Sequence, residues 1–439
     1  MVNLNWQKYP VYKSSGVEWL GDIPEHWEVK RLKRLVKKII DGTHFTPNYV
    51  DEGIPFLRVT DIHGSSINMN NVKYISQKEH EQLSKRCNPE KGDVLLSKNG
   101  TIGITKVVDW DYPFSIFVSL CLLKPVFQDI DSYFLSYIFQ GKIIDDQILE
   151  SSKTTSVTNL HLDKIQNLTI VVPPLSEQQA IANFLDEKTA QIDEYIAKKQ
   201  RIIELLKEQK TVIINQAVTK GINPDVPMKY SGIEWLGEIP EHWEVLPAFA
   251  VFKEQCVINR DLVEKNLLSL SYGKIIRKSF TNNFGLLPES FETYQIVTPG
   301  NIILRLTDLQ NDKRSLRVGL VKEKGIITSA YLCLNPQNVI PEYVYTLLHI
   351  YDILKIFYSM GSGVRQNMKF KDLKRLPITF PPVSEQKEIV SFIEKKLEKI
   401  ERSLTVIEKE IKLTQEYRTT LISETVTGKI DVRKYHPPQ

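Results

Sequence analysis

The sequence has little cysteine and no pattern of metal ligands. Its 439 residues include four cysteines, Cys87, Cys121, Cys256 and Cys333, which are too far apart for a C-x-x-C pair. No cluster of histidines completes a zinc site, so the spacing excludes a bound metal of that kind. We expect the four thiols to be small core residues in a reducing cytoplasm.

Long apolar runs are also missing. No stretch approaches the ~18 consecutive apolar residues that a membrane-spanning helix needs, so we expect no contact with a membrane. Met1 leads to Trp6 and Lys8 without an apolar segment, which predicts that there is no signal peptide. These features predict a cytoplasmic protein.

The familiar catalytic motifs are absent. There is no G-x-x-x-x-G-K-[ST] phosphate-binding loop, since Gly428-Lys429 is followed by Ile430, and no G-x-G-x-x-G fingerprint. The paired prolines lack the flanking residues of the [DNS]PP[YF] loop of an amino-methyltransferase, and neither G-x-S-x-G nor H-E-x-x-H occurs. These absences predict a chain that is not an enzyme.

A strong excess of one charge is missing as well. The chain has 57 Lys and Arg against 53 Asp and Glu, a formal net charge of +4, which permits nucleic-acid binding without requiring it. Local clustering is more informative. Six Lys or Arg and no acid lie between Lys30 and Lys38, and a second basic stretch from Arg305 to Arg317 is relieved by two aspartates. A solvated face is the alternative interpretation of both runs.

What the sequence does have is an internal repeat. Residues 15–29 and 231–245 agree at thirteen of fifteen positions, as SGVEWLGDIPEHWEV and SGIEWLGEIPEHWEV. Residues 173–185 and 381–393 agree at seven of thirteen, as PPLSEQQAIANFL and PPVSEQKEIVSFI, and a Val-Thr pair closes each copy. Three matches in one order indicate a duplication with a unit of about half the chain. A protein with two similar halves should read a target that comes in two parts.

A long helix is predicted to follow each proline pair. The first should begin at Ser176 as N-cap, with Gln179 completing a capping box, and the second at Ser384 without that box. The apolar series of the first helix is Ile181, Leu185, Ile192, Tyr195, Ile202, Leu206 and Ile213. That of the second is Ile389, Ile393, Leu397, Ile400, Leu404, Ile407 and Ile411.

Each helix would be about 60 Å long at 1.5 Å per residue. So narrow an apolar stripe is typical of a coiled-coil seam, and we predict that the two helices pair in an antiparallel arrangement. The alternative is that each helix packs on its own domain.

The segments 30–172 and 246–380 are predicted to be mixed domains with short strands. Fragments of the two stay in register, as at Gly92–Leu96 and Gly300–Leu304, although the first copy is eight residues longer before this glycine. The scaffold therefore repeats while the surface differs, as a two-part, non-palindromic ligand would require.

Two polar motifs could be interpreted as catalytic. Glu25-His26-Trp27 and its copy at 241–243 lie beside Leu and Ile, which favours packing. The loop Asp41-Gly42-Thr43-His44 has no counterpart in the second copy. It could hold a catalytic dyad, but a DNA-facing loop or a plain turn is favoured.

These residues together resemble a known family. The doubled GVEWLGDIPEHWEV box, the doubled PPLSEQQAIANFL helix start, the GTHFTPNY loop at Gly42–Tyr49 and the phrase GIPFLRVTDI at Gly53–Ile62 resemble the specificity subunit of type I restriction-modification systems. The resemblance covers nearly the whole chain. It implies two target-recognition domains held apart by an antiparallel pair of long helices, each domain reading one half of a split site on double-stranded DNA.

The expected fold class is α+β, with two similar mixed α/β target-recognition domains, an antiparallel coiled coil and a pseudo-twofold repeat. We place the first domain at 1–175, with its repeat box at 15–29, and the central spacer helix at 176–220. The second domain follows at 221–383, with its box at 231–245, and the C-terminal helix and tail at 384–439.

The resemblance also implies partners and cofactors. Two modification (methyltransferase) subunits would dock on the helices, carry S-adenosylmethionine and methylate adenine. Two restriction (motor and nuclease) subunits, which use ATP and Mg, would join the larger complex. This chain would be non-catalytic and would hold no metal or cofactor itself. The helix starts fall within the expected docking regions, with candidates Ser176, Gln178, Ile181, Phe184, Ser384, Gln386, Ile389 and Phe392.

The residues that contact DNA cannot be transferred from the family, because its recognition domains are variable. Arg, Lys, Asn, Gln and Thr in loops suit phosphates and base edges. The candidates in the first domain are Thr43, His44, Arg58, Thr60, Lys98, Asn99, Lys153 and Thr154. Those in the second are Arg305, Arg314, Arg317, Arg365 and Gln366. A solvated surface residue is the alternative at each position.

Two other functions remain open from the residues alone. A stand-alone bivalent DNA-binding regulator fits a duplicated reader on a helical spacer, and a neighbouring gene for a methyltransferase with an NPPF-type loop would argue against it. An enzyme with an unrecognised active site would show turnover with DNA and either S-adenosylmethionine or ATP.

Overall fold

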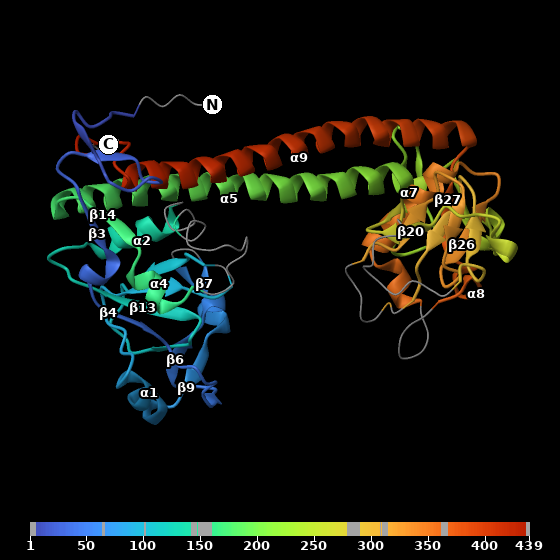
Figure 1. Cartoon of the computed structure of the whole chain (residues 1–439). Coiled ribbons are helices and arrows are strands. Elements are labelled where there is room, and N and C mark those ends of the chain that lie inside the picture. The colour runs from blue at the N-terminus through green and yellow to red at the C-terminus, as the bar shows by residue number, and fades with distance from the viewer. Residues whose placement is uncertain are drawn as a thin grey trace. The chain divides into compact units, whose positions relative to one another are not determined.

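The computed structural model describes residues 6–63, 66–100, 102–141, 147, 160–278, 290–307, 309, 315–360 and 368–435. The chain divides into two compact units, residues 1–199 with 408–439 and residues 200–407. Each unit contains a mixed α/β domain and a part of both long helices, α5 (Leu175–Lys220) and α9 (Val383–Val426) (Figure 1). The predicted fold class is confirmed.

The first unit has fourteen strands in its described part. They are β1 (Tyr12–Ser14), β2 (Asp22–Pro24), β3 (Glu28–Arg31), β4 (Val36–Asp41), β5 (Tyr49–Val50), β6 (Ile54–Leu57), β7 (Ile62–His63), β8 (Ser66–Ile67), β9 (Lys73–Ile75), β10 (Val94–Ser97), β11 (Thr105–Val107), β12 (Ser115–Ile116), β13 (Leu120–Pro125) and β14 (Thr169–Val172). Its short helices are η1 (Leu32–Arg34), η2 (Val59–Asp61), η3 (Met69–Asn71), α1 (Gln77–Ser84), α2 (Ser132–Gln140) and α4 (Leu162–Gln166).

The second unit has thirteen strands in its described part. They are β15 (Met228–Tyr230), β16 (Glu238–Pro240), β17 (Glu244–Pro247), β18 (Phe252–Gln255), β19 (Val257–Ile258), β20 (Leu268–Ser271), β21 (Lys274–Arg277), β22 (Gln295–Val297), β23 (Ile302–Leu304), β24 (Val318–Leu320), β25 (Gly325–Ile327), β26 (Leu332–Pro336) and β27 (Pro377–Phe380). Its short helices are α6 (Ala248–Val251), η4 (Arg260–Leu262), α7 (Pro341–Ile353), η5 (Ile356–Ser359) and α8 (Phe370–Leu373).

The two units share one scaffold. The main sheet of the first has the order β11-β10-β13-β4, and that of the second has the matching order β24-β23-β26-β18. Gly92 and Gly300 precede the central strand of each sheet with φ of +90°, a conformation that favours glycine. The pairs β1-β2 and β3-β14 also recur, as β15-β16 and β17-β27, but the outer sheets differ, since β12-β6-β9-β5 has four strands and β19-β22-β25 has three. The internal repeat therefore holds at the level of structure, while the outer sheets diverge.

In both units the repeated Trp box packs against the repeated helix start. Trp27 and Trp243 are fully buried. His26 Nε2 lies 2.8 Å from Glu177 at the start of α5, and His242 Nε2 lies 2.8 Å from Glu385 at the start of α9. The packing interpretation of the Glu-His-Trp motif is correct, because its histidines and tryptophans are used to anchor a helix.

The helix starts differ in detail from the sequence prediction. α5 begins at Leu175, so Ser176 lies inside the first turn and the predicted capping box with Gln179 is wrong. The carbonyl of Pro174 instead accepts from the backbone of Glu177 and Gln178. In the second copy the carbonyl of Pro382 accepts from Gln386 in the same way. The proline pair ends the preceding extended segment one residue earlier than expected.

Within each unit the two long helices run antiparallel (Figure 1). In the first unit Lys199 pairs with Glu410 at 2.7 Å, and Arg418 lies 3.1 Å from Asp193. In the second unit Lys210 pairs with Glu401. Partners later along α5 are earlier along α9, which confirms the predicted antiparallel pair.

The apolar seam of α5 departs from the predicted series in its middle. Tyr195 and Ile202 are 42% and 40% exposed, so both assignments were wrong. The less exposed positions recur at gaps of four and three, as a 3.5-residue seam requires. They are Ile192, Ile196, Lys199, Ile203, Leu206, Lys210, Ile213 and Ala217. The predicted series of α9 is buried or half-buried throughout.

The structure shows where the four cysteines lie. Cys87, Cys121 and Cys333 are buried, but Cys256 is exposed, so it is not the core residue that we expected. Within the described ranges, no helix combines the length and apolar character that crossing a bilayer takes. In the same part of the chain no His, Cys, Asp and Glu side chains are grouped so that they could hold a metal ion.

Candidate nucleic-acid interface

The loop that follows β4 is held tightly against the first domain. The backbone N–H of Gly42 donates to Leu120, and that of Thr43 donates to Ile116. A Cβ on Gly42 would lie 2.0 Å from the Ile116 carbonyl oxygen, so this close approach requires glycine. The position of the loop is therefore fixed by backbone contacts rather than by its own side chains.

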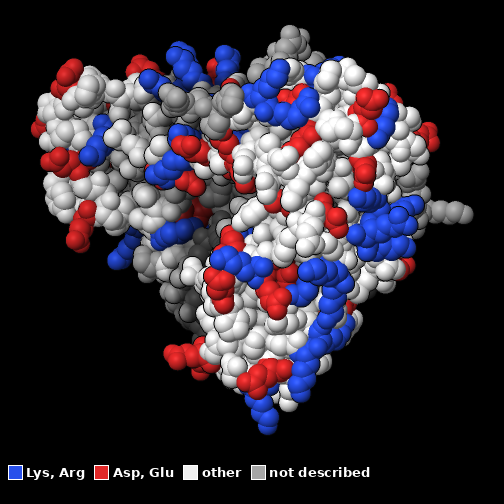
Figure 2. Space-filling view, turned by 90° about the vertical axis from the view of Figure 1, so that its left-hand side faces the viewer, with Lys and Arg blue, Asp and Glu red and all other residues white. Residues whose placement is uncertain are grey.

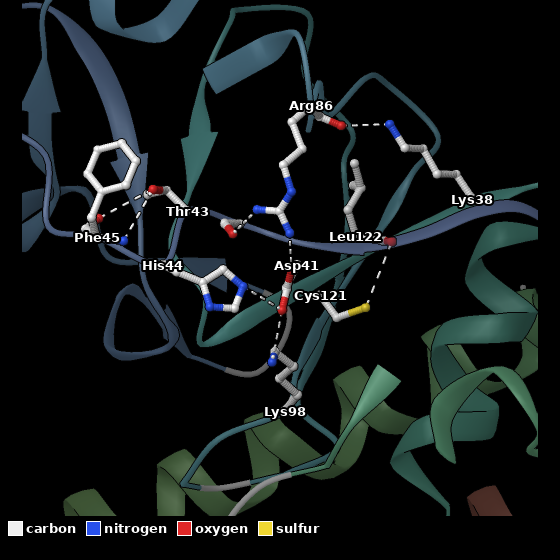
Figure 3. A network of polar contacts seen from close by, with 10 residues as sticks. Lys38, Asp41, Thr43, His44, Phe45, Arg86, Lys98, Cys121 and Leu122 are labelled. Atoms are coloured by element: carbon white, nitrogen blue, oxygen red, sulfur yellow. Dashed lines mark hydrogen bonds and ion pairs between the residues drawn. The ribbon is translucent and has the colours of Figure 1, made fainter. Parts of the chain in front are cut away.

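Asp41 ends β4 and gathers three cationic or ionisable side chains (Figure 3). Its carboxylate lies 2.6 Å from Arg86, 3.2 Å from the Lys98 ammonium and 3.1 Å from the His44 ring. The side chains of Asp41 and Lys98 are 6% and 7% exposed, whereas Arg86 and His44 reach solvent. We call Asp41, His44, Arg86 and Lys98 the Asp41 cluster.

The electrostatics of the Asp41 cluster favour an excess of positive charge. Burial raises the pKa of the Asp41 carboxyl, but hydrogen bonds from Lys98, His44 and Arg86 outweigh burial, so this pKa lies below its ordinary value of 3.8. One carboxylate faces the formal positive charges of both Arg86 and Lys98 and therefore offsets only part of them. The remainder is available to an anion at the exposed edge of the loop.

The loop does not have the geometry of a nucleophile with its base. Thr43 is buried, and its hydroxyl contacts the backbone of Phe45 rather than the ring of His44. His44 and Phe45 are both largely exposed. Their neighbours Glu79, Gln82 and Arg86 help to line a hollow of about 430 Å³. This arrangement suits contact with an external ligand and does not support the catalytic dyad.

A second polar hollow lies near η2. The Arg58 guanidinium is bound to the fully buried Asp61 at 2.8 Å and to the Asn71 carbonyl at 3.0 Å, which fixes its direction. Exposed Thr60 and Lys73 lie on the same hollow, which measures about 360 Å³. Asn99, next to Lys98, is half-buried, and its Oδ1 has no partner among the described residues.

The second domain does not repeat the Asp41 cluster. Counting along the matching ladders, from Leu96 opposite Cys121 and Leu304 opposite Leu332, puts Cys256 in the place of Asp41. Leu306 takes the place of Lys98, since each accepts a backbone hydrogen bond from the segment before the last small helix. The same scaffold position is thus charged in one domain and neutral in the other.

The candidate residues of the second domain divide into two groups. Arg317 is fully buried, and its guanidinium donates to the carbonyls of Arg305 and Thr307 and to the Tyr358 hydroxyl. This placement argues against a base contact and makes Arg317 a support for the segment that begins at half-buried Arg305. Lys153, Thr154, Arg314, Arg365 and Gln366 lie outside the described residues.

Several of the candidate docking residues are internal. The Gln178 amide bonds Asp129, Asp131 and Pro173, and the Gln386 amide bonds Ile340 and Pro381, each 0% exposed. Ile181 and Ile389 are buried too, whereas Ser176 and Ser384 are exposed. The two glutamines hold each long helix to its own domain.

The matching aromatic residues Phe184 and Phe392 have different surroundings. Phe184 is 2% exposed and is covered by Trp6 and Tyr435, both edge-on at ring centroid distances of 5.3 and 4.8 Å. Phe392 is only half-buried and lines a hollow of about 490 Å³ with Ile213, Ile222 and Met228. Only Phe392 of the pair is therefore accessible from outside.

Sequence reasoning missed the residues that position the site. Arg86 had no motif to mark it, because it lies 45 residues from Asp41 in the sequence. Asp61 lies within the phrase at Gly53–Ile62, but nothing in that phrase indicated that it binds Arg58. Glu177 and Glu385 could have been found, since each lies in the repeated SEQ motif and each copy also has an unexplained histidine.

The chain thus holds two copies of one scaffold that differ in the side chains at the same loop position. Its relatives agree. A sequence profile of the type I restriction modification DNA specificity domain matches residues 24–207 and 257–413. The putative type I restriction enzyme MjaX specificity subunit of Methanocaldococcus jannaschii is 26% identical over 430 residues, covering 94% of this chain and 96% of that one. The MjaVIII specificity subunit of the same organism is 23% identical over 446 residues, covering 94% of each.

A solved structure points to the same fold. A chain from a study of complex assembly and conformational transition of the type I R-M system superposes with a TM-score of 0.67 at 13% identity, over 93% of this chain and 99% of that one. The present chain belongs to the family of type I restriction-modification DNA specificity subunits. It is a non-catalytic subunit with the role of recognising DNA sequence.

Proposed function

We propose that each domain reads one half of a bipartite, asymmetric site on double-stranded DNA, with a gap of fixed length between the halves. The observation that carries this proposal is the shared order of the two main sheets combined with different side chains at the same place, Asp41 and Lys98 against Cys256 and Leu306. Identical readers would favour a palindrome, whereas unlike readers favour two unlike half-sites.

The first half-site is read by side chains near the Asp41 cluster and the hollow at η2. His44, Thr60 and Asn99 are the proposed contacts to base edges, and Arg58 is the proposed cation, held in place by Asp61. Lys98 and Thr43 are buried, so their part is to hold the loop. In the second domain the proposed contacts are Arg305, Arg314, Arg365 and Gln366.

The helix starts are proposed to dock two modification subunits, one near each domain. The repeat offers two similar surfaces, the internal counterpart of an isologous arrangement. Exposed Ser176, Ser384 and Phe392 are the proposed contacts. S-adenosylmethionine belongs on these partners, because methylating a base inside a duplex requires a pocket for the flipped base. Two restriction subunits would bring the sites for ATP and Mg. A stand-alone regulator is not favoured by the relatives.

A selection experiment tests the reading model. The chain, co-purified with its methyltransferase partner, is used to select sequences from a random duplex library, in parallel with His44→Ala and Arg305→Ala variants. We expect two conserved segments around a gap of one length. His44→Ala should relax the first segment and Arg305→Ala the second. Relaxation of both segments by either variant would contradict one reader per half-site.

A further inference from the structure

The basic run of the first domain lies on its surface without acidic partners. Lys30 pairs with Glu28, but the rest of the run stays exposed and forms no ion pair with a carboxylate among the described residues. We call Arg31, Lys33, Arg34, Lys37 and Lys38 the first basic surface. β3 and β4 lie on the left of the first unit in Figure 1, the side that faces the reader in Figure 2, where Lys and Arg side chains gather.

The contacts of the first basic surface are with neutral groups. Arg31 donates to the Asn167 carbonyl and the Thr169 hydroxyl, Lys33 to Asn167 Oδ1, and Lys38 to the Arg86 carbonyl. These bonds orient the cations without neutralising them. The surface therefore retains close to five positive charges within a stretch of eight residues.

Most of the corresponding residues of the second domain are not basic. The exception is Lys253, which pairs with Asn335 on the ladder as Lys38 pairs with Lys124, and is exposed. β3 and β17 pair with β14 and β27 in the same register, which places Pro247 at the position of Arg31, Phe249 at that of Lys33 and Ala250 at that of Arg34. If the second domain had only lost these basic residues, its corresponding face would carry little charge. The face is nevertheless basic, because another element supplies cations.

The second domain carries its cations at α8 and the two residues after it. Lys371, Lys374 and Arg375 are exposed and form no ion pair among the described residues. They lie on the same face, since the Phe249 N–H donates to the Lys374 carbonyl. Arg375 occupies the place of Asn167, which binds Lys33 in the first domain. We call these three residues the second basic surface.

The two copies thus keep positive charge on one face with residues most of which do not correspond, Lys38 and Lys253 being the shared pair. Common descent of the scaffold does not explain the cations of the second basic surface, because Arg375 stands in the place of Asn167, the neutral partner of Lys33. We propose that the first and second basic surfaces bind the phosphate backbone of the DNA, one for each half-site. This deepens the proposed function and rests on it. Sequence-independent contacts of this kind would hold the DNA while the loops read base edges.

The composition of the surfaces favours DNA over a protein partner. Protein interfaces are depleted in lysine and enriched in aromatic residues at their centre. The first basic surface consists of exposed Lys and Arg, and the Asp41 cluster continues it, since Lys38 bonds Arg86 (Figure 3). Long flexible cations without carboxylate partners are suited to a polyanion that presents a phosphate every few ångströms.

Salt dependence of binding tests the proposal. Full-length variants Lys33→Gln/Arg34→Gln/Lys37→Gln and Lys371→Gln/Lys374→Gln/Arg375→Gln are compared with the unmodified chain on a duplex bearing the selected site, across a series of KCl concentrations. The matched control is Lys198→Gln/Arg201→Gln/Lys207→Gln on α5, which removes the same charge from exposed positions. Thermal unfolding checks that each variant is folded.

Each test variant should lower the slope of log affinity against log salt by about two to three, because each phosphate contact contributes about 0.9. Affinity at low salt should fall roughly tenfold or more, while discrimination against a mutated half-site stays unchanged. Slopes equal to that of the control would overturn the proposal. Loss of methyltransferase association with an unchanged slope would assign the surfaces to a protein partner instead. If the unmodified chain selects no two-part sequence, the proposed function fails, while the slopes still decide whether phosphates are bound here.

Discussion

At the scale of single residues, the first domain places the basic side chains of Arg86 and Lys98 on one buried carboxylate, Asp41. Asp41 thereby fixes the direction of Arg86 and the exposed His44, and it compensates the ammonium of Lys98 inside the domain. Removing one partner of a buried pair leaves the other charged and unsatisfied, which costs more than the pair itself contributes.

We therefore predict that Asp41→Asn destabilises the first unit by about 2–4 kcal/mol and weakens recognition of the first half-site. Denaturant unfolding measures the first effect and competition binding the second. Asp51→Asn, at an exposed position, is the control and should change neither. Normal stability in the Asp41→Asn protein would show that Lys98 does not need the carboxylate.

The same contact predicts a dependence on pH. Because the folded-state pKa of Asp41 lies below its ordinary value of 3.8, the ionised carboxylate favours the folded state. That stabilisation is fully present above about pH 4 and is lost as the pH falls through the folded-state pKa. The stability difference between the unmodified chain and Asp41→Asn should therefore shrink at acidic pH, as unfolding at pH 7 and pH 3 would measure. A constant difference would contradict this assignment.

Arg317 gives a residue-scale prediction for the second domain. Its guanidinium bonds two backbone carbonyls and the Tyr358 hydroxyl in the interior, so Arg317→Ala should destabilise the second unit by about 2–4 kcal/mol. Arg317→Lys should restore little of it, because an ammonium lacks the planar fork. Arg314→Ala should relax the second half-site without this loss. Full stability of Arg317→Ala would restore Arg317 as a base-contact candidate.

Sequence alone could identify the polar loop at Asp41–His44 but not its role. The loop was visible because one copy has it and the other does not. Its partners Arg86 and Lys98 come from distant strands and turns, and only the folded sheet brings them together. Arg317 was a candidate DNA contact because it lies in a basic, polar stretch. Nothing in the sequence indicated that its guanidinium would bond backbone carbonyls inside the domain.

At the scale of elements, the periodicity of apolar residues correctly predicted that α5 pairs with α9. It did not correctly predict which residues of α5 form the seam. Tyr195 and Ile202 were predicted as seam residues because each is larger than its neighbour or equally apolar. The 3.5-residue repeat instead places the next residues, Ile196 and Ile203, in the seam. Lys199 and Lys210 occupy seam positions and pair with glutamates of α9, so they specify register more than stability.

Helix length gives the element-scale prediction for recognition. Deleting residues 201–207 from α5 and 403–409 from α9 removes one heptad from each and keeps the seam facing inward. The helices become about 10 Å shorter, so the accepted gap should shrink by up to about three base pairs. Selection from duplexes with variable gaps measures this. An unchanged gap would show that the helices do not set the spacing.

The helix starts give a prediction about assembly. Phe392→Asp should lower occupancy of one methyltransferase subunit while the chain stays folded, because Phe392 is half-exposed. Phe184→Asp should instead destabilise the first unit, since it places a charge beneath Trp6 and Tyr435. Native mass spectrometry of the complex with its partner, beside thermal unfolding, separates the two effects. A two-to-one complex with Phe392→Asp would exclude this docking surface.

At the scale of the whole molecule, duplication with divergence is the property from which the others follow. The repeated boxes predicted two copies of one scaffold, and the matching sheet orders confirm them. The divergent sheets and loops could not be predicted, because they have no repeat to compare and depend on pairings between distant residues. The function could be inferred from the sequence because the scaffold repeats. The base contacts could not be inferred, because the reading surface differs between the two copies.

The most direct test of this account is to sequence methylated adenines in DNA from cells that express this chain with its methyltransferase partner. The account predicts one motif with two unlike specific segments, separated by a gap of a single length. Both segments should be lost together if the chain is deleted, and an Arg314→Ala chain should relax one of them. A single continuous motif, or a palindrome, would contradict two different readers on one scaffold.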